Sequence, residues 1–286
     1  MAQTETGEGA RDTADKASSG DVAAWVKGLA RFGYAAKGVV YAIIGVLAAQ
    51  VAFGGGGGGQ TTGQSGALQT IAGQPFGRIM LGLVAVGLIG YALWRLVQAI
   101  MDPEQEGSDG EGIVKRLGYG ISGLTYAGLA FSAFRIIQGS GGGGGSNAQG
   151  FTARLMSQPF GQWLVGIVGV IIIAVGIFQL YKGATAKFRE DLKLSEMGST
   201  EETWATRAGR VGLCARGVVY GVIGALLIQA ALQSNPQQAG GLGKALQTLA
   251  QQPYGPWLLG LVALGLVAYG AYAALVLARF RKIEVR

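Results

Sequence analysis

The sequence predicts an all-α protein that crosses a membrane with six helices. Half of the residues are hydrophobic and only 14% are charged. The hydrophobic residues gather in six blocks of about 20 to 25 residues, each long enough to cross the roughly 30 Å hydrocarbon core of a bilayer as a helix. No segment outside these blocks has the periodic pattern of a water-soluble core. We therefore expect a polytopic membrane protein.

Two motifs recur three times and divide the chain into three units. The motif R-x-G-x4-G-x2-Y lies at Arg31–Tyr41, Arg116–Tyr126 and Arg210–Tyr220. The motif Q-P-F/Y-G lies at Gln74–Gly77, Gln158–Gly161 and Gln252–Gly255. Both motifs return at a spacing of roughly 90 residues, and such a fixed spacing is typical of tandem structural repeats.

Each repeat is expected to hold two membrane helices separated by a glycine-rich or polar loop. Residues 1–20 are polar and are predicted to form a disordered cytoplasmic tail. The repeats are then assigned to residues 21–101, 102–195 and 196–286. Trp25 and Trp204 precede the first motif in the first and third repeats and predict short surface helices there. The second repeat lacks this tryptophan.

A short helix and a proline are expected before the second membrane helix of each repeat. Segments with one apolar side begin at Ala67, Phe151 and Lys244. We expect them to lie half-submerged at the extracytoplasmic membrane surface. The second membrane helix is predicted to begin at the proline of the motif, because proline suits the first turn of a helix and disfavours helix in the residue before it. These prolines are Pro75, Pro159 and Pro253.

The distribution of charge predicts the orientation. With six spans, both termini and the two linkers between repeats share one side of the membrane. The loop side carries only four cationic residues, Arg78, Arg135, Arg154 and Lys244. By the positive-inside rule both termini are therefore expected in the cytoplasm. The net charge of +7 then reflects membrane orientation, and no nucleic-acid partner is expected.

The residue types argue against catalysis and metal binding. The chain has one cysteine, Cys214, and no histidine. A disulfide within the chain and the usual imidazole or thiolate metal sites are therefore excluded. No Asp or Glu lies inside a predicted span, which argues against proton relays and sodium-coupled sites. We expect no enzymatic activity, no catalytic residue and no cofactor.

The cations deepest in the predicted spans leave two interpretations open. Lys37 and Arg216 occupy equivalent positions about two turns into their spans, where the second repeat has Ser122. In one interpretation these side chains extend to lipid phosphates at the membrane surface. In the other, Arg31 with Lys37, and Arg210 with Arg216, hold an anionic lipid headgroup or an anionic solute between repeats. Such a site would be asymmetric.

Small residues in the first helix of each repeat predict close helix packing. A glycine is followed by a small residue four positions on, a spacing that lets two helix backbones approach closely. A tyrosine follows three positions after each glycine, on the same side of the helix, and is expected to pack or to form hydrogen bonds between helices. These residues are Gly38 with Tyr41, Gly123 with Tyr126, and Gly217 with Tyr220.

The two repeated motifs resemble a known bacterial family. Three copies of a two-helix unit, with R-x-G-x4-G-x2-Y opening the first helix and Q-P-F/Y-G opening the second, are similar to the membrane family DUF1206, a domain of unknown function. The resemblance covers about residues 24–280, and the second copy departs from it by lacking the Trp and the Lys or Arg. The resemblance implies a multi-pass protein of the bacterial inner (plasma) membrane with no established activity.

Two function hypotheses from different classes follow. Because every unit has two spans, all three point the same way and are expected to surround a pseudo-threefold axis. The first hypothesis is a non-enzymatic scaffold, assembly or envelope-homeostasis protein, working as a homo-oligomer or with another membrane protein. The alternative is a transporter, channel or lipid-binding protein for a small neutral or anionic solute. A polar cavity on the axis that reaches Lys37 and Arg216 would favour the alternative. An axis filled by Leu, Ile and Val would favour the first hypothesis.

Overall fold

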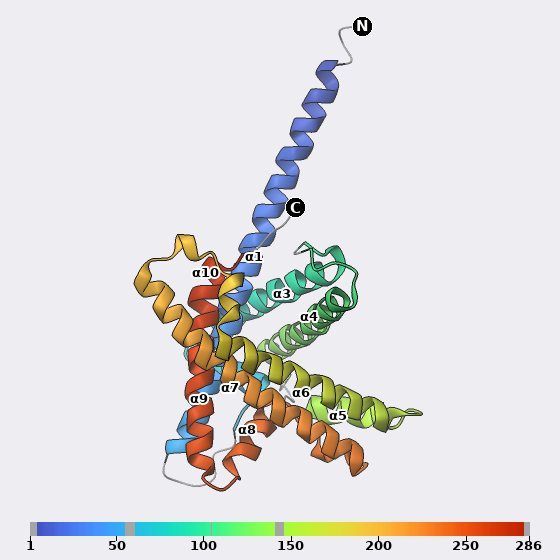
Figure 1. The fold of residues 1–286 in the computed structure, drawn as a ribbon, viewed down its shortest axis with the longest axis vertical. Coiled ribbons are helices and arrows are strands. Elements are labelled where there is room, and N and C mark those ends of the chain that lie inside the picture. The colour runs from blue at the N-terminus through green and yellow to red at the C-terminus, as the bar shows by residue number, and fades with distance from the viewer. Residues whose placement is uncertain (1–4, 55–60, 104, 141–145, 283–286) are drawn as a thin grey trace.

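The computed structural model describes residues 5–54, 61–103, 105–140 and 146–282. Within these ranges the chain is helical, with no strand beyond one isolated bridge (Figure 1). Six helices are long and apolar enough to cross a membrane, which confirms the predicted all-α class with six spans. They cover Lys27–Phe53, Gly77–Met101, Gly112–Ile137, Gly161–Thr185, Ser199–Leu232 and Gly255–Phe280.

The first helix is much longer than its membrane span. Helix α1 covers Glu5–Phe53 and projects beyond the rest of the molecule at its N-terminal end (Figure 1). It therefore includes most of the tail that the sequence analysis assigns to a disordered segment. Extending an existing helix costs far less than nucleating a new one, so the span can propagate into residues that would not fold alone. The surface helix expected at Trp25 is likewise a straight continuation of α1, with that side chain 74% exposed.

The spans associate as neighbouring pairs drawn from different repeats (Figure 1). Helix α3 (Gly77–Met101) packs along α4 (Gly110–Ile137), and α6 (Gly161–Thr185) packs along α7 (Ser199–Leu232). Helix α9 (Gly255–Ala271) packs along α1. Within repeats, α1 also contacts α3, and α7 contacts α9. Among the described residues, α4 and α6 make no comparable contact.

The three short helices form where they are expected, and two of them pack their apolar side against the membrane helices. They are α2 (Gln64–Ala72), α5 (Ser146–Met156) and α8 (Leu242–Ala250). The apolar side of α2 is buried against α1, α3 and α4, and that of α8 against α7 and α9. Leu68 and Leu246 are 0% exposed. The apolar side that we expected to face lipid therefore packs on neighbouring helices. An apolar side in the sequence does not reveal whether it faces lipid or protein.

The Q-P-F/Y-G motif forms the same tight turn in all three repeats. In the first repeat, the Gly77 amide donates to the Gln74 carbonyl at 2.8 Å, and Phe76 has φ 60° and ψ 16°. These values are close to a type II turn, with proline at its second position and an aromatic residue in the left-handed conformation at its third. Phe160 and Tyr254 adopt the same conformation.

These turns correct the predicted helix starts. The second membrane helices begin at Gly77, Gly161 and Gly255, two residues after each proline. Each glycine lies against the end of the preceding short helix. A Cβ at Gly161 would come within 1.9 Å of the Leu155 carbonyl oxygen, so only glycine fits there. The proline shapes the turn and the glycine opens the helix.

The linker between the second and third repeats is folded against the C-terminal end of the last span. Two short 3₁₀ segments, η1 (Lys187–Asp191) and η2 (Leu194–Glu196), bring Leu192 into an isolated antiparallel bridge with Arg281. Phe188 is 2% exposed and stacks edge-on against Tyr272. Tyr272 begins the π-helical stretch η4 (Tyr272–Leu277), which is followed by α10 (Ala278–Phe280). A last 3₁₀ turn, η3 (Pro236–Gln238), contacts α5 and α7 at the opposite end.

Candidate functional site

The candidate site is a cluster of cations and tyrosines inside the membrane spans. Lys37 of α1 is 4% exposed and points into the protein. Its Nζ donates to the Tyr91 hydroxyl at 2.9 Å and lies 4.6 Å from the centre of that ring. The same Nζ is 5.3 Å from the Tyr126 ring and 5.7 Å from the Tyr269 ring. Four helices, α1, α3, α4 and α9, therefore surround one lysine.

A second cation shares the Tyr91 hydroxyl. Arg95 lies one turn after Tyr91 on α3, and its Nε donates to that hydroxyl at 2.9 Å. Its Nη1 donates to Gln98 at 3.0 Å, and its guanidinium lies 4.9 Å from the Tyr119 ring of α4. The Tyr91 oxygen thus accepts hydrogen bonds from two cationic groups.

The third cation, Arg216 of α7, sits among another set of tyrosines. Its Nη2 donates to the Tyr220 hydroxyl at 2.6 Å. The guanidinium lies 4.3 Å from the Tyr269 ring and 5.2 Å from the Tyr41 ring, and these two rings meet edge to face. The Nε of Arg216 is buried and has no hydrogen-bond partner. An unpaired buried donor on a charged group costs free energy, of order 1–3 kcal/mol or more.

The cations of the first and third repeats have equivalent surroundings. Lys37 lies over Tyr91 of its own repeat and Tyr126 of the next. Arg216 lies over Tyr269 of its own repeat and, in the same way, over a tyrosine of the first repeat, Tyr41. In the second repeat the corresponding residues are Ser122, Val175 and Tyr220. The arrangement therefore occurs twice, in the first and third repeats. The second repeat lacks both the cation and the tyrosine of the second helix.

The cluster holds three cations and no carboxylate in any contact that the described residues make with them. Lys37 and Arg95 share the Tyr91 hydroxyl, and Lys37 and Arg216 both face the Tyr269 ring. The nearest acidic residues on α7, Glu201 and Glu202, are in its first turn, roughly 20 Å along the helix from Arg216. Like charges repel strongly away from bulk water. Cation–π contacts of about 0.5–2 kcal/mol each offset only part of the cost of burying them.

The structure separates the four cations that the sequence groups together. Lys37 and Arg216 point into the cluster and do not extend to a membrane surface. Arg31 and Arg210 are exposed and take no part in the cluster. Arg95 belongs to it and is absent from the sequence-predicted set. Its spacing of four residues from Tyr91 places both on one face of α3 and is the signal that identifies it.

The glycines of the first motif lie where helices from neighbouring repeats touch. A Cβ at Gly38 would come within 2.5 Å of the Gly270 carbonyl oxygen of α9. At Gly123 it would meet Leu96 of α3 at 2.9 Å. At Gly217 it would meet Leu180 of α6 at 2.7 Å. In each case the glycine of one repeat contacts the second helix of the repeat before it, with the first repeat following the third.

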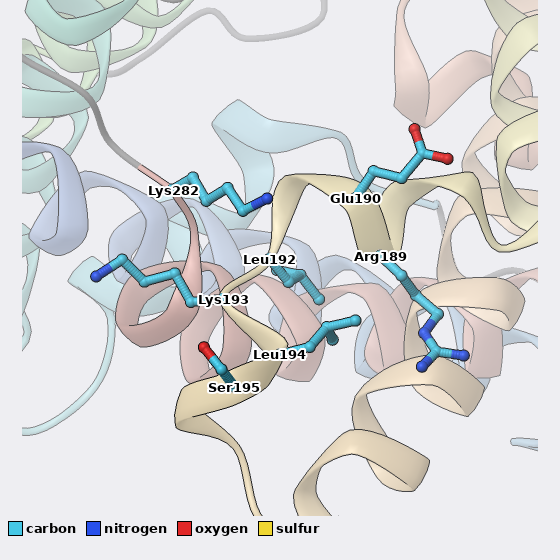
Figure 2. A pocket seen from close by; sticks show the side chains of 7 residues that line it. All are labelled: Arg189, Glu190, Leu192, Lys193, Leu194, Ser195 and Lys282. Carbon is cyan, nitrogen blue, oxygen red and sulfur yellow. The ribbon is translucent and has the colours of Figure 1, made fainter.

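A pocket on the linker is a weaker candidate. It has a volume of about 370 Å³ and is lined by residues 189–190, 192–195 and 282. Figure 2 shows that its cationic side chains, Arg189, Lys193 and Lys282, point in different directions. Arg189 is paired with Glu202, and Lys193 with Glu196 at 2.8 Å. These charges therefore stabilise the folded linker and do not converge on a ligand.

Comparison with known sequences agrees with the repeated architecture. The family profile described as "Domain of Unknown Function (DUF1206)" matches residues 32–102, 117–186 and 211–281. The chain belongs to the DUF1206 family. The three matches confirm three tandem copies, as the motifs predict, and each match includes the greater part of two span-length helices.

One DUF1206 relative aligns over nearly the whole chain. It is "Uncharacterized protein YxxB" of Bacillus subtilis (strain 168), which is 39% identical over 249 residues, covering 87% of this chain and 89% of the relative. No solved structure matches this chain. Family membership supports the three tandem repeats and assigns no chemistry.

Proposed function

We propose that this protein binds an anion inside the membrane, at the junction of its three repeats, and that it catalyses no reaction. The observation that carries the proposal is the set of three inward-pointing cations, Lys37, Arg95 and Arg216, with no carboxylate among their contacts. A membrane protein rarely buries charge without a functional reason. An anion at the cluster relieves the repulsion and supplies an acceptor for the buried Nε of Arg216.

The surrounding tyrosines suit such a site. Tyrosine hydroxyls both donate and accept, so they can turn toward a bound anion while their rings stay packed against the cations. The rings that face Lys37 and Arg216 are tyrosines, not Leu, Ile or Val, and these polar surroundings support the proposal. The tyrosines around Lys37 and those around Arg216 would form two related but unequal halves of one site.

The proposal includes the membrane arrangement. We place the protein in the bacterial inner membrane with both termini in the cytoplasm, because nearly all cationic residues lie on the side of the termini and linkers. The cyclic contacts of Gly38, Gly123 and Gly217 support a pseudo-threefold arrangement of two-helix repeats.

Thiol labelling tests the orientation. In a Cys214→Ala background, a membrane-impermeant thiol reagent outside the cell should label Gln252→Cys and leave Ser195→Cys unlabelled. The reverse pattern would invert the orientation.

Native mass spectrometry of the full chain extracted with its own lipids tests the binding site. We expect a bound anionic species that is lost in Lys37→Gln/Arg216→Gln. The matched control is Arg31→Gln/Arg210→Gln, which removes the same number of charges at exposed positions and should retain the species. Arg216→Lys keeps the charge and provides a milder change should the double variant unfold. A wild-type protein without any bound anion, or retention by the double variant, would overturn the proposal.

A scaffold or assembly role is the second candidate, favoured by the fixed linker at the C-terminal end of the last span. Its bridge between Leu192 and Arg281 and its buried Phe188 give the molecule a defined surface at the membrane boundary. In this case a stoichiometric protein partner, or a second copy of the chain, should appear in the same spectra. Substitution of Lys37 and Arg216 should leave that association intact.

A further inference from the structure

The second repeat differs from the other two in how its spans are joined. Helix α1 packs on α3, and α7 packs on α9, whereas α4 and α6 make no comparable contact in the described part of the chain. The 18-residue windows of these two spans are only 22% buried, against 39–56% for the other four. Two helices that would be neighbours by analogy with the other repeats are thus left apart.

Equivalent positions in the repeats locate the separation. Val175 of α6 is 44% exposed, whereas Tyr91 and Tyr269 at the same position of their repeats are 0% and 2% exposed. Phe178 is 56% exposed, whereas its counterparts Trp94 and Tyr272 are 1% and 2% exposed. Positions that are closed in the other two repeats are therefore partly open in the second.

The facing side of α4 shows the same exposure. Thr125 is exposed, although its counterparts Val40 and Val219 are 0% exposed. We call the surface formed by Thr125, Val175 and Phe178 the open seam. It is mostly apolar. It lies in the second repeat at the place where the other two repeats have their cation–tyrosine contacts.

The open seam lies beside the helix that carries Arg216, because Gly176, next to Val175, packs against Gly217 and Tyr220 of α7. Ser122 lies one turn from Thr125 on α4 and is partly exposed, as are Tyr220 and Arg216. The Arg216 Nη2 donates to the Tyr220 hydroxyl at 2.6 Å, on the side of α7 that packs against α6. An apolar approach that ends at a cation fits a molecule with an apolar chain and an anionic group.

We propose that the open seam binds an anionic phospholipid, with an acyl chain between α4 and α6 and its phosphate at Arg216. The inference rests on the proposed function and specifies its ligand. Arg216 lies six residues, or roughly 9 Å, along α7 from the exposed Arg210. The lipid enters laterally from the bilayer to the depth of Arg216, and its acyl chain stays in the hydrophobic interior of the membrane. Val175 stands where the other two repeats have a buried tyrosine, so this position fills less of the space between the helices.

Photolabelling of the full chain in phosphatidylcholine nanodiscs tests this proposal. The probe is phosphatidylglycerol with a diazirine in its acyl chain, compared with phosphatidylcholine carrying the same group. We expect the anionic probe to label residues 121–129 and 171–179 several-fold more than the neutral one. Arg216→Gln should abolish the preference, and Arg210→Gln should retain it. Equal labelling by the two probes, or a preference that survives Arg216→Gln, would mean ordinary lipid contact and would overturn the proposal.

A second pair of variants tests the route itself. Val175→Tyr installs the residue that the other two repeats carry and should suppress labelling in both segments. Ile177→Tyr is the control, because that side chain is 61% exposed and its counterpart Leu93 is also 48% exposed, so both face bulk lipid. Thermal unfolding of each variant establishes that it is folded. Undiminished labelling in folded Val175→Tyr would place the lipid elsewhere.

The two proposals fail in different ways. If the anionic probe shows no preference while native spectra show a small anion lost from Lys37→Gln/Arg216→Gln, the lipid proposal is wrong and the anion site stands. If neither a lipid nor a small anion depends on these residues, both are wrong.

Discussion

Gly38 of α1 and Gly270 of α9 touch backbone to backbone, joining the first repeat to the third. A Cβ at Gly38 would lie 2.5 Å from the Gly270 carbonyl oxygen, and one at Gly270 would lie 2.7 Å from the Gly38 oxygen. Without a strong hydrophobic drive between helices in lipid, such close approach is a main source of association. The contact also sets the distance between Lys37, next to Gly38, and Tyr269, next to Gly270.

Gly38→Ala should therefore destabilise the protein. The added methyl group meets main-chain atoms of α9 that cannot move independently, and overpacking of this kind costs about 1–3 kcal/mol. Gly221→Ala is the matched control, because a Cβ there has nothing within 4 Å. It should leave stability unchanged or raise it by about 0.5–1 kcal/mol through helix propensity. Thermal unfolding in detergent distinguishes them, and equal midpoints would contradict the packing argument.

Tyr91→Phe should destabilise the cluster while preserving its shape. The change removes one oxygen that accepts from both Lys37 and Arg95, and hydrogen bonds to charged groups contribute about 1.5–3 kcal/mol each. The expected result is a lower unfolding midpoint. Tyr254→Phe provides the control, since Tyr254 is 81% exposed and the other two repeats have Phe at its position. A Tyr91→Phe protein as stable as Tyr254→Phe would show that these bonds contribute little.

Phe188→Ala should release the linker between α6 and α7 without unfolding the spans. The ring packs on Tyr272 and on Gly209, and loss of a buried phenylalanine costs about 3–5 kcal/mol. Trypsin should then cut at Lys187, Arg189 or Lys193 much faster than in the wild type. Ser195→Ala changes an exposed side chain of the same linker and should retain wild-type resistance. Rapid cleavage of the wild-type linker would contradict a folded connection.

The turn that follows α3 should depend on pH. The Asp102 carboxylate accepts from the Glu106 amide at 2.8 Å and the Gly107 amide at 2.9 Å, and these bonds lower the pKa of Asp102 below its ordinary value. A lowered pKa in the folded state means that the stabilisation is present above the unfolded-state pKa, near 4, and is lost as the pH falls through the folded pKa.

Hydrogen exchange of the two amides measures this effect. After correction for intrinsic rates, protection of Glu106 and Gly107 should be full at neutral pH and fall under strongly acidic conditions. Asp102→Ala should remove it at every pH. Asp109→Ala should instead affect the Gly112 amide, to which Asp109 is bonded at 3.0 Å. Protection in wild type that does not change with pH would contradict the role of the Asp102 carboxylate.

The sequence predicts the helices well because their signals are local. Six apolar blocks are sufficient to define six spans, and the spacing of Gly38 and Ala42 is sufficient to indicate a close contact on α1. That spacing does not identify the partner, however. Gly270 lies in the last span, more than 200 residues away, and any small-residue helix could have taken its place. Pairing between repeats is a tertiary property.

The cluster could be predicted only in part for the same reason. Lys37 and Arg216 stand out because they are cations in apolar surroundings. Whether such a side chain extends to the membrane surface or turns inward depends on what faces it, and the rings of Tyr91 and Tyr269 come from other helices. Arg95 sits near the end of its span, where an arginine is common at a membrane surface. Phe188 is one apolar residue in a charged linker and gives no periodic signal.

The left-handed aromatics before the second spans have a consequence for the membrane itself. Phe76, Phe160 and Tyr254 are held at one backbone geometry and are 80–81% exposed, directly ahead of Gly77, Gly161 and Gly255. Aromatic rings favour the boundary between hydrocarbon and water, so three rigid turns fix that boundary at the same point of each repeat. The three turns thus fix one face of the bilayer relative to the start of each second span. A thinner or thicker membrane would be met by a change in helix tilt, because these rings cannot slide along the chain.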